Sequence, residues 1–188
     1  MKNVNKYNFM VKIILLCILL CSCGSTYTTG GVLVSKPKLY PAYVKTPQDI
    51  NDWLIAEGFY YKLDKTKKDE WKTPEQTIKD KGNDCEDYAI LVHYILKDLG
   101  YKNVMIMAIY GKSLAHGITW FQEKDGSWSF FSVGVNLEGD KLFYWDSKLN
   151  NAFYILNNYF PKWVYIKLCT PKGINVKTFY RKDVFREE

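Results

Sequence analysis

Residues 84–100 have the sequence DCEDYAILVHYILKDLG, and this stretch decides the fold. Its large apolar residues recur at the i, i+3, i+4, i+7 spacing of one face of an α-helix. Acidic residues crowd its start, where the positive end of a helix dipole favours them, and Gly100 is a typical residue just after a helix end. The stretch therefore predicts an amphipathic helix. Its buried face consists of Tyr88, Leu91, Val92, Ile95, Leu96 and Leu99.

Cys85 lies in the first turn of this predicted helix. Unpaired backbone N–H groups and the helix dipole stabilise a thiolate at such a position, and a thiolate is the nucleophilic form of cysteine. At 100° per residue, Cys85 falls at the edge of the buried face. We therefore expect its sulfur to face the layer on which the helix packs.

The flanking sequence predicts helices before this stretch and strands after it. Thr46-Pro47-Gln48-Asp49 and Thr73-Pro74-Glu75-Gln76 are helix starts, with Gly58 and Gly82 as the stops. Alternating or continuous apolar runs predict strands at 104–110, 115–121, 127–135, 141–145 and 163–168, and Asp125-Gly126 predicts a hairpin turn. A further helix is expected at 151–159, followed by a solvated tail at 181–188. Helices first and an antiparallel sheet afterwards indicate an α+β fold.

His116 lies in the second predicted strand and shares a face with Ile118 and Trp120. We expect the imidazole to project from this apolar face toward the start of the helix. A Cys–His pair is the minimal apparatus for thiol acyl transfer, because the imidazole accepts the thiol proton and later protonates the leaving amine. The backbone N–H of Cys85 is a candidate donor to the developing oxyanion.

These motifs together resemble the transglutaminase-like superfamily, and most of all its bacterial cysteine proteinase branch. The resemblance covers about residues 68–135 and rests on Trp71, Pro74–Ile78, Gly82–Ala89, Leu91, Gly100-Tyr101 and His116. It implies a papain-like α+β core in which the nucleophile stands at a helix start packed on an antiparallel sheet. It further implies that Cys85 is the nucleophile, that His116 is the base, and that the substrates are peptide or amide bonds. No metal or organic cofactor is implied, and the superfamily includes hydrolases, cross-linking acyl transferases and inactive members.

The third catalytic position departs from the pattern of this family. Its members usually carry an Asp about sixteen residues after the His, in a Trp-x-x-x-Asp context, where this sequence has Trp128 followed by Ser132. A serine hydroxyl can accept the imidazole N–H and fix its tautomer, but it stabilises an imidazolium less than a carboxylate does. Ser132 is the first candidate by spacing. Asn136, Asp140 and Asp146 remain alternatives.

The first residues have the organisation of a signal peptide. Lys2, Lys6 and Lys12 precede an apolar run at 13–20. The run is short for a membrane-spanning helix, and a short membrane anchor is the alternative. Residues 20–23, Leu-Cys-Ser-Cys, resemble a bacterial lipobox. The resemblance implies a palmitate-bearing lipoprotein with lipidated Cys23. Cys21 fits less well, because bulky Leu20 would precede the cut.

The expected organisation is a signal peptide at 1–22, a lipidated tether at 23–38 and one domain at 39–188. Such a protein would be lipid-anchored in the cell envelope, at an outer membrane or the cell surface, and we expect a monomer. The formal net charge is +6, which falls to +3 without the three leader lysines. So mild a balance without a basic run argues against a nucleic-acid partner.

We therefore expect a membrane-anchored thiol enzyme that hydrolyses or transfers peptide or isopeptide acyl groups on a peptide or protein substrate. The first alternative is a catalytically impaired member that holds a peptide or protein partner in the same site. The second is a structural lipoprotein in which Cys85 is inert or forms a disulfide with Cys169.

Overall fold

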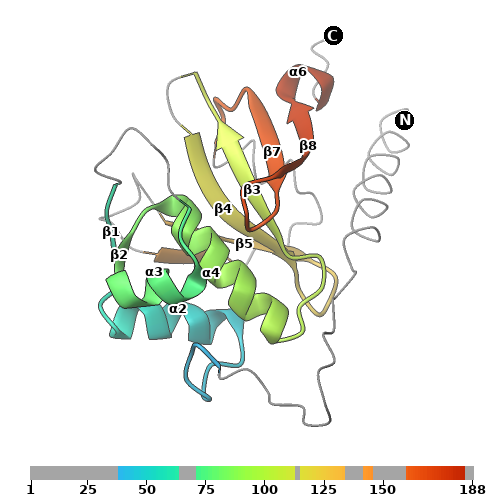
Figure 1. Ribbon diagram of the computed structural model, residues 1–188. Coiled ribbons are helices and arrows are strands. Elements are labelled where there is room, and N and C mark those ends of the chain that lie inside the picture. The colour runs from blue at the N-terminus through green and yellow to red at the C-terminus, as the bar shows by residue number, and fades with distance from the viewer. Residues whose placement is uncertain (1–37, 64–70, 113–114, 134–141, 146–159, 185–188) are drawn as a thin grey trace, which may run out of the picture. The chain divides into compact units, whose positions relative to one another are not determined.

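The computed structural model describes residues 38–63, 71–112, 115–133, 142–145 and 160–184 (Figure 1). The proposed leader and lipidated Cys23 lie outside these residues, as do Asn136, Asp140, Asp146 and the helix expected at 151–159. Within the described part of the chain, no helix is long and apolar enough to span a bilayer.

The centre of the fold is a six-stranded sheet with every neighbouring pair antiparallel and the strand order β6-β5-β4-β3-β7-β8. Five of its strands occupy the predicted segments, and β8 does not. Their bounds are β3 Met105–Tyr110, β4 Ala115–Gln122, β5 Trp128–Val133, β6 Leu142–Trp145, β7 Tyr165–Cys169 and β8 Asn175–Tyr180. The predicted turn connects β4 to β5, with Gly126 at φ 89°. A short helix, α6 (Arg181–Val184), follows β8 at the start of the expected tail.

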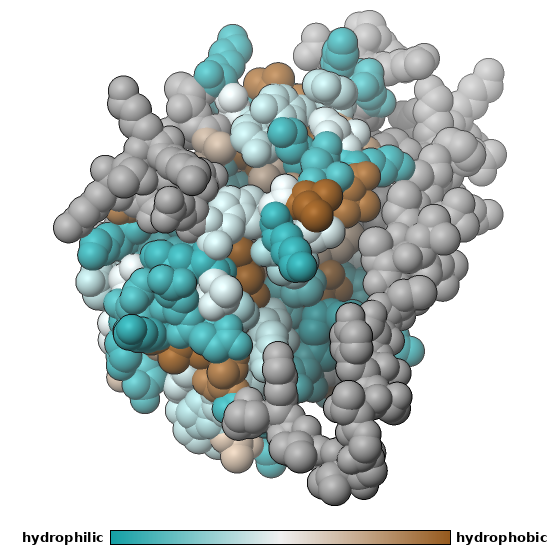
Figure 2. All heavy atoms as spheres, viewed as in Figure 1, coloured by the Kyte–Doolittle hydropathy of each residue, from teal (hydrophilic) through white to brown (hydrophobic). Residues whose placement is uncertain are grey.

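Three helices precede the large sheet, as the sequence predicts. They are α2 (Pro47–Ala56), α3 (Pro74–Asp80) and α4 (Cys85–Asp98). Thr46 and Asp49 form a complete capping box at α2, and Thr73 caps α3. Figure 1 shows α4 running along the sheet, with α2 and α3 on the side of α4 away from β7 and β8. On the face seen in Figure 2, hydrophilic residues gather over α3, and apolar residues show only as small separate patches.

The end of α3 differs from the prediction. Lys81, not Gly82, takes the left-handed conformation after the helix, with φ 56°. Gly82 instead belongs to β2 (Gly82–Asn83), which pairs in parallel with β1 (Tyr60–Tyr61). A Cβ at Gly82 would lie 2.5 Å from the far end of the Tyr60 side chain, so a larger residue here would require this exposed ring to move.

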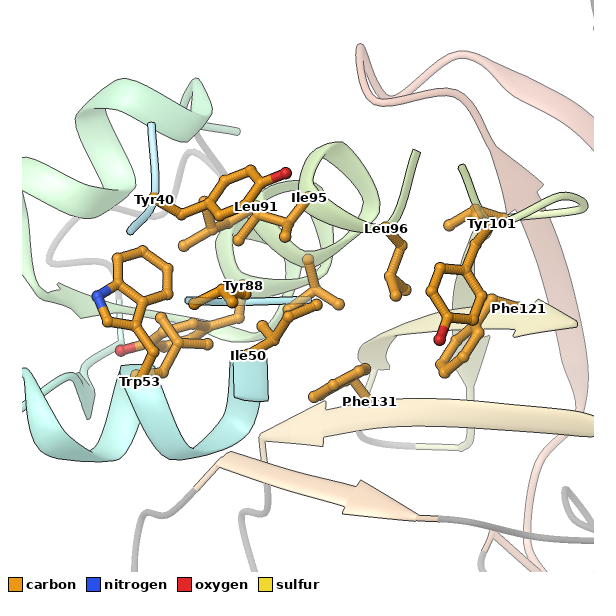
Figure 3. Packing of buried hydrophobic residues seen from close by; sticks show 14 residues of the cluster. Tyr40, Ile50, Trp53, Tyr88, Leu91, Ile95, Leu96, Tyr101, Phe121 and Phe131 are labelled. Carbon is orange, nitrogen blue, oxygen red and sulfur yellow. The ribbon is translucent and has the colours of Figure 1, made fainter. Parts of the chain in front are cut away.

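The core forms where α4 packs between α2 and the sheet, and Figure 3 shows Tyr88, Leu91, Ile95 and Leu96 among the side chains that fill it. Phe121 of β4 belongs to the same cluster, and Thr119 Oγ1 of β4 donates to the Ala89 carbonyl at 2.7 Å. The predicted buried face of the helix is confirmed.

The orientation of β4 corrects one expectation. The residues that face α4 are Gly117, Thr119 and Phe121, so His116, Ile118 and Trp120 lie on the opposite face of the sheet. Ile118 and Trp120 are also buried, with exposures of 0% and 1%. Because β4 is apolar on both faces, the alternation shows which residues share a face but not which face meets the helix.

Candidate active site

Cys85 is the first residue of α4 and lies directly over the start of β4. A Cβ built on Gly117 would stand 3.2 Å from the Cα of Glu86 and 3.4 Å from the carbonyl carbon of Cys85. Any other residue would therefore push the strand away from the helix start. The glycine beside His116 thus brings the backbone of the candidate base against the backbone of the candidate nucleophile.

The thiol of Cys85 contacts Glu86, the next residue along the chain. Cys85 Sγ donates to Glu86 Oε2 at 3.2 Å, and Glu86 is 9% exposed. Burial, and then the negative charge of Glu86, raise the pKa of the Cys85 thiol far above its ordinary value. The N–H of Gly117 opposes this change but is outweighed. Burial and the Glu86 charge therefore favour the protonated thiol, whereas the helix start considered alone favours a thiolate.

His116 lies near the start of β4 and is hydrogen-bonded to Ser132, the residue that the sixteen-residue spacing predicted. Its Nε2 is 2.7 Å from Ser132 Oγ, and its ring packs against Phe160 with centroids 5.6 Å apart. The register that pairs Ile118 with Ser132 places the serine diagonally opposite the histidine on the same sheet face. Burial lowers the pKa of His116 to about 4, so the imidazole is neutral at pH 7. A neutral imidazole that donates Nε2–H to the serine keeps Nδ1 as its basic nitrogen.

The structure thus joins His116 to Ser132 and places Cys85 beside the adjacent Gly117. The hydrogen bonds among the described residues do not include one between Cys85 and His116. Proton transfer requires hydrogen-bond reach, and catalytic contacts commonly tighten only when substrate binds. For acid–base work on the sulfur, the thiol must leave Glu86 and approach the imidazole.

A buried ion pair fixes the first turn of α4. Asp87 is fully buried: its Oδ1 accepts the backbone N–H of Lys72 at 2.8 Å, and its Oδ2 forms an ion pair with Lys72 Nζ at 2.8 Å. Lys72 Nζ also donates to Asn83 Oδ1 at 3.0 Å, and Asn83 Nδ2 donates to the Thr77 carbonyl at 2.9 Å. This network ties the chain before α3 to the first turn of α4. The acidic residues after Cys85 were visible in the sequence as helix-start groups, but nothing in the pattern connected them with Lys72.

The structure describes two cysteines, Cys85 and Cys169. Cys85 and Cys169 are both free thiols, so the structure does not contain the alternative disulfide. Cys169 of β7 packs under α4 with Ala89 and Ile90. Among the described residues, no three His, Cys, Asp or Glu side chains gather as metal ligands.

These elements define an α+β domain with a cysteine at the first turn of a helix and a histidine on the strand beneath it. The chain belongs to the transglutaminase-like domain family, whose sequence profile matches residues 34–173. The predicted transglutaminase-like family is thereby confirmed, and the helices and antiparallel sheet described above confirm the α+β fold class.

Solved structures of Legionella pneumophila LapG are similar to this chain. One is 21% identical with a TM-score of 0.41, covering 72% of this chain and 67% of that one. The calcium-bound form is 20% identical with a TM-score of 0.43 and the same coverage, 72% and 67%. The EGTA-treated form is 20% identical with a TM-score of 0.40, covering 73% and 71%. Among curated proteins, no sequence matches this chain.

Proposed function

We propose that this protein is a membrane-anchored thiol enzyme that hydrolyses or transfers peptide or isopeptide acyl groups. Cys85 is the nucleophile, His116 the base and Ser132 the group that orients the imidazole. The observation that carries the proposal is the contact of Gly117 with the Cys85–Glu86 backbone, next to a histidine whose Nε2 lies 2.7 Å from Ser132 Oγ. Membership of the transglutaminase-like family supports it.

The reaction follows from these groups. The Cys85 thiol first leaves Glu86 and reaches the imidazole, which lies on the other face of β4. It then gives its proton to Nδ1 of His116, and the sulfur attacks the substrate carbonyl carbon to form a tetrahedral oxyanion. The N–H of Cys85, at the N-terminus of α4, is placed to donate to this oxyanion. The C–N bond then breaks, the imidazolium protonates the leaving amine, and a thioester remains on Cys85. Water completes hydrolysis, or an amine completes acyl transfer, and we prefer hydrolysis.

The proposed site of action is the cell envelope. The support is the lipobox-like sequence ending at Cys23 and the following tether to residue 38. A protein held in this way would act on peptide bonds in the cell wall or in surface proteins. Mass spectrometry of the mature N-terminus tests the anchor, which requires a diacyl or triacyl mass on Cys23 that Cys23→Ala lacks. An unmodified N-terminus at any other residue would contradict it.

The first test of the enzyme is the pH dependence of Cys85 alkylation by iodoacetamide. We compare the domain from Ser25 onward with its His116→Ala and Ser132→Ala forms, and add hydroxylamine to peptide reactions to trap the thioester. The proposal expects trapped acyl hydroxamate that disappears in Cys85→Ala and His116→Ala. It also expects that added peptide substrate speeds deprotonation of the Cys85 thiol in the wild type but not in the His116→Ala and Ser132→Ala forms. A thiol that reacts identically in all three forms, with no hydroxamate, would contradict it.

A second candidate is a binding module that holds a peptide or protein partner in the same site without turnover. Two observations favour it: Ser132 stands where a carboxylate is usual, and the Cys85 thiol donates to Glu86. Ser132→Asp separates the two candidates. In an enzyme limited by its third residue the carboxylate raises the imidazole pKa and the turnover rate, whereas in a binding module it changes neither hydroxamate formation nor peptide affinity.

A further inference from the structure

The sheet face that carries α4 continues past the start of the helix onto β3, β7 and β8. The strand registers set out its rows. Gly117, which contacts the Cys85–Glu86 backbone, pairs with Ala108, which pairs with Lys167, which pairs with Thr178. In the next row, Tyr110 pairs with Tyr165, and Tyr165 pairs with Tyr180. All these residues share one face, because cross-strand partners point the same way.

The three tyrosines form a continuous row of rings, which we call the tyrosine row (Tyr110, Tyr165 and Tyr180). The first two rings stack with centroids 4.5 Å apart and planes 14° apart, and the second and third centroids are 5.9 Å apart. Tyr180 is 47% exposed, and the other two are half-buried. The row is therefore accessible from solvent along its length.

Lys167 places a positive charge beside the tyrosine row. Its Nζ lies 5.1 Å from the Tyr110 ring centroid and 5.8 Å from that of Tyr165. Within the described parts of the chain it has no carboxylate partner. At the open end of the row, Lys182 Nζ lies 5.9 Å from the Tyr180 ring.

This combination selects an anionic ligand. Ring edges are the positive side of the aromatic quadrupole, phenol hydroxyls are hydrogen-bond donors, and an ammonium has donors only. A carboxylate can interact with all three kinds of group at once and supplies a counter-charge to Lys167, which has none among the described residues.

We propose that the tyrosine row and Lys167 bind an acidic side chain of the substrate, so that Cys85 acts on peptides carrying Asp or Glu near the reacting bond. This inference rests on the proposed function and names its substrate class. Lys167 lies two strands from Gly117, or about 10 Å at ordinary strand spacing. Ala108 between them is buried against α4, so the peptide would follow the tyrosine row, where Tyr110 pairs with the exposed Ala115 next to His116. An extended peptide advances about 3.3 Å per residue, so the acidic residue lies about three positions from the reacting carbonyl.

The test measures binding without turnover. The full-length chain carrying Cys85→Ala, in detergent, is titrated into a fluorescein-labelled peptide with Glu three positions from its central amide, and into the matched Gln peptide. Fluorescence anisotropy gives both affinities at low and at high salt. We expect the acidic peptide to bind roughly five- to tenfold more tightly, with the preference shrinking as salt screens the charge.

Two substitutions assign the preference to the row. Lys167→Gln removes it. Lys177→Gln is the matched control, because Lys177 pairs with Leu168 and so lies on the other face of the same two strands, and this variant keeps it. Tyr165→Leu weakens both peptides, and circular dichroism confirms that each variant is folded. If Tyr165→Leu does not fold, the two lysine variants still decide the question.

Several outcomes overturn the inference. Equal affinity for the two peptides does so, as does a preference that survives Lys167→Gln. If an anionic oligosaccharide displaces the acidic peptide, and its own binding depends more strongly on Lys167, then the oligosaccharide and not the peptide is the ligand of the tyrosine row. Thioester trapping separates the two proposals: turnover without an acidic preference refutes the tyrosine row alone, and an acidic preference without any turnover refutes the enzyme alone.

Discussion

Replacing Glu86 with glutamine is expected to make Cys85 a faster nucleophile. Glu86 Oε2 accepts a hydrogen bond from Cys85 Sγ at 3.2 Å in a nearly buried position, and the charge of Glu86 opposes formation of a thiolate beside it. Glutamine keeps the size and one acceptor oxygen but removes the charge. Burial, which is the largest cause of the raised thiol pKa, stays unchanged in the variant. The expected change is therefore a partial return of reactivity.

The magnitude follows from the geometry. Two unit charges 3.2 Å apart repel by about 5 kcal/mol at an effective dielectric constant near 20. Relaxation and entering water reduce this to roughly 1.5–3 kcal/mol, the range for hydrogen bonds to charged groups. The thiolate fraction at fixed pH then rises about 10- to 150-fold. A less basic thiolate is also a weaker nucleophile, which takes back about half of the gain on a logarithmic scale. The alkylation rate is expected to rise about 3- to 12-fold.

The assay is the second-order rate of iodoacetamide reaction at Cys85 between pH 7 and 9, read by mass spectrometry of the Cys85 peptide so that Cys169 is counted separately. Glu75→Gln is the matched control, because it removes a carboxylate from the exposed first turn of α3. Glu75→Gln should react like the wild type. If Glu86→Gln reacts no faster than the wild type while remaining folded, Glu86 does not govern the thiol, and burial alone accounts for its pKa.

Three further predictions concern stability. Asp87→Ala leaves Lys72 without its buried partner and is expected to lower the unfolding free energy by about 3 kcal/mol or more. The loss would be measured as a lower midpoint of urea unfolding. A change below about 1 kcal/mol would show that water replaces the carboxylate. Gly117→Ala places a Cβ 3.2 Å from the Glu86 Cα, and should lower the unfolding free energy by about 1–3 kcal/mol and slow Cys85 alkylation. Unchanged stability would mean that the strand shifts freely. The fold lowers the pKa of His116 to about 4, so between pH 6.5 and pH 4 the unfolded chain binds a proton at this histidine that the folded chain does not bind. The contribution of His116 to the free energy of unfolding is therefore present above pH 6.5 and is lost, by up to about 3 kcal/mol, as pH falls to 4. Urea unfolding across that range should show the loss, and His116→Gln should reduce its slope; an equal slope in both would assign the loss to other groups.

The helices could be predicted because their signals are local. Thr46 and Thr73 cap α2 and α3 as their sequence contexts indicate, and the apolar period of α4 matches the buried side. Strand β8 was missed because it is an edge strand with exposed or half-buried residues throughout, so no buried face repeats with period two. The pairing of β1 with β2 is two residues long, too short for any period.

The site could be predicted in part. The sixteen-residue spacing and the Asp125-Gly126 turn bring Ser132 diagonally opposite His116, because a tight hairpin fixes the register. The side of the sheet that meets α4 could not be read from a strand that is buried on both faces. The protonation of Cys85 was also missed, because the helix-start argument considers the dipole and omits the burial and the Glu86 charge that outweigh it.

The hydrogen bond from Cys85 to Glu86 has a consequence for the chemical durability of the protein. The thiolate is the form that attacks peroxides and disulfides, so a cysteine kept as a buried thiol oxidises slowly. In the oxidising compartment that the proposed lipid anchor implies, the sulfur would in this way stay reduced between encounters with substrate. The carboxylate that slows Cys85 as a nucleophile also shields it from sulfenic acid formation, and the more reactive Glu86→Gln form should be the first to be lost to peroxide.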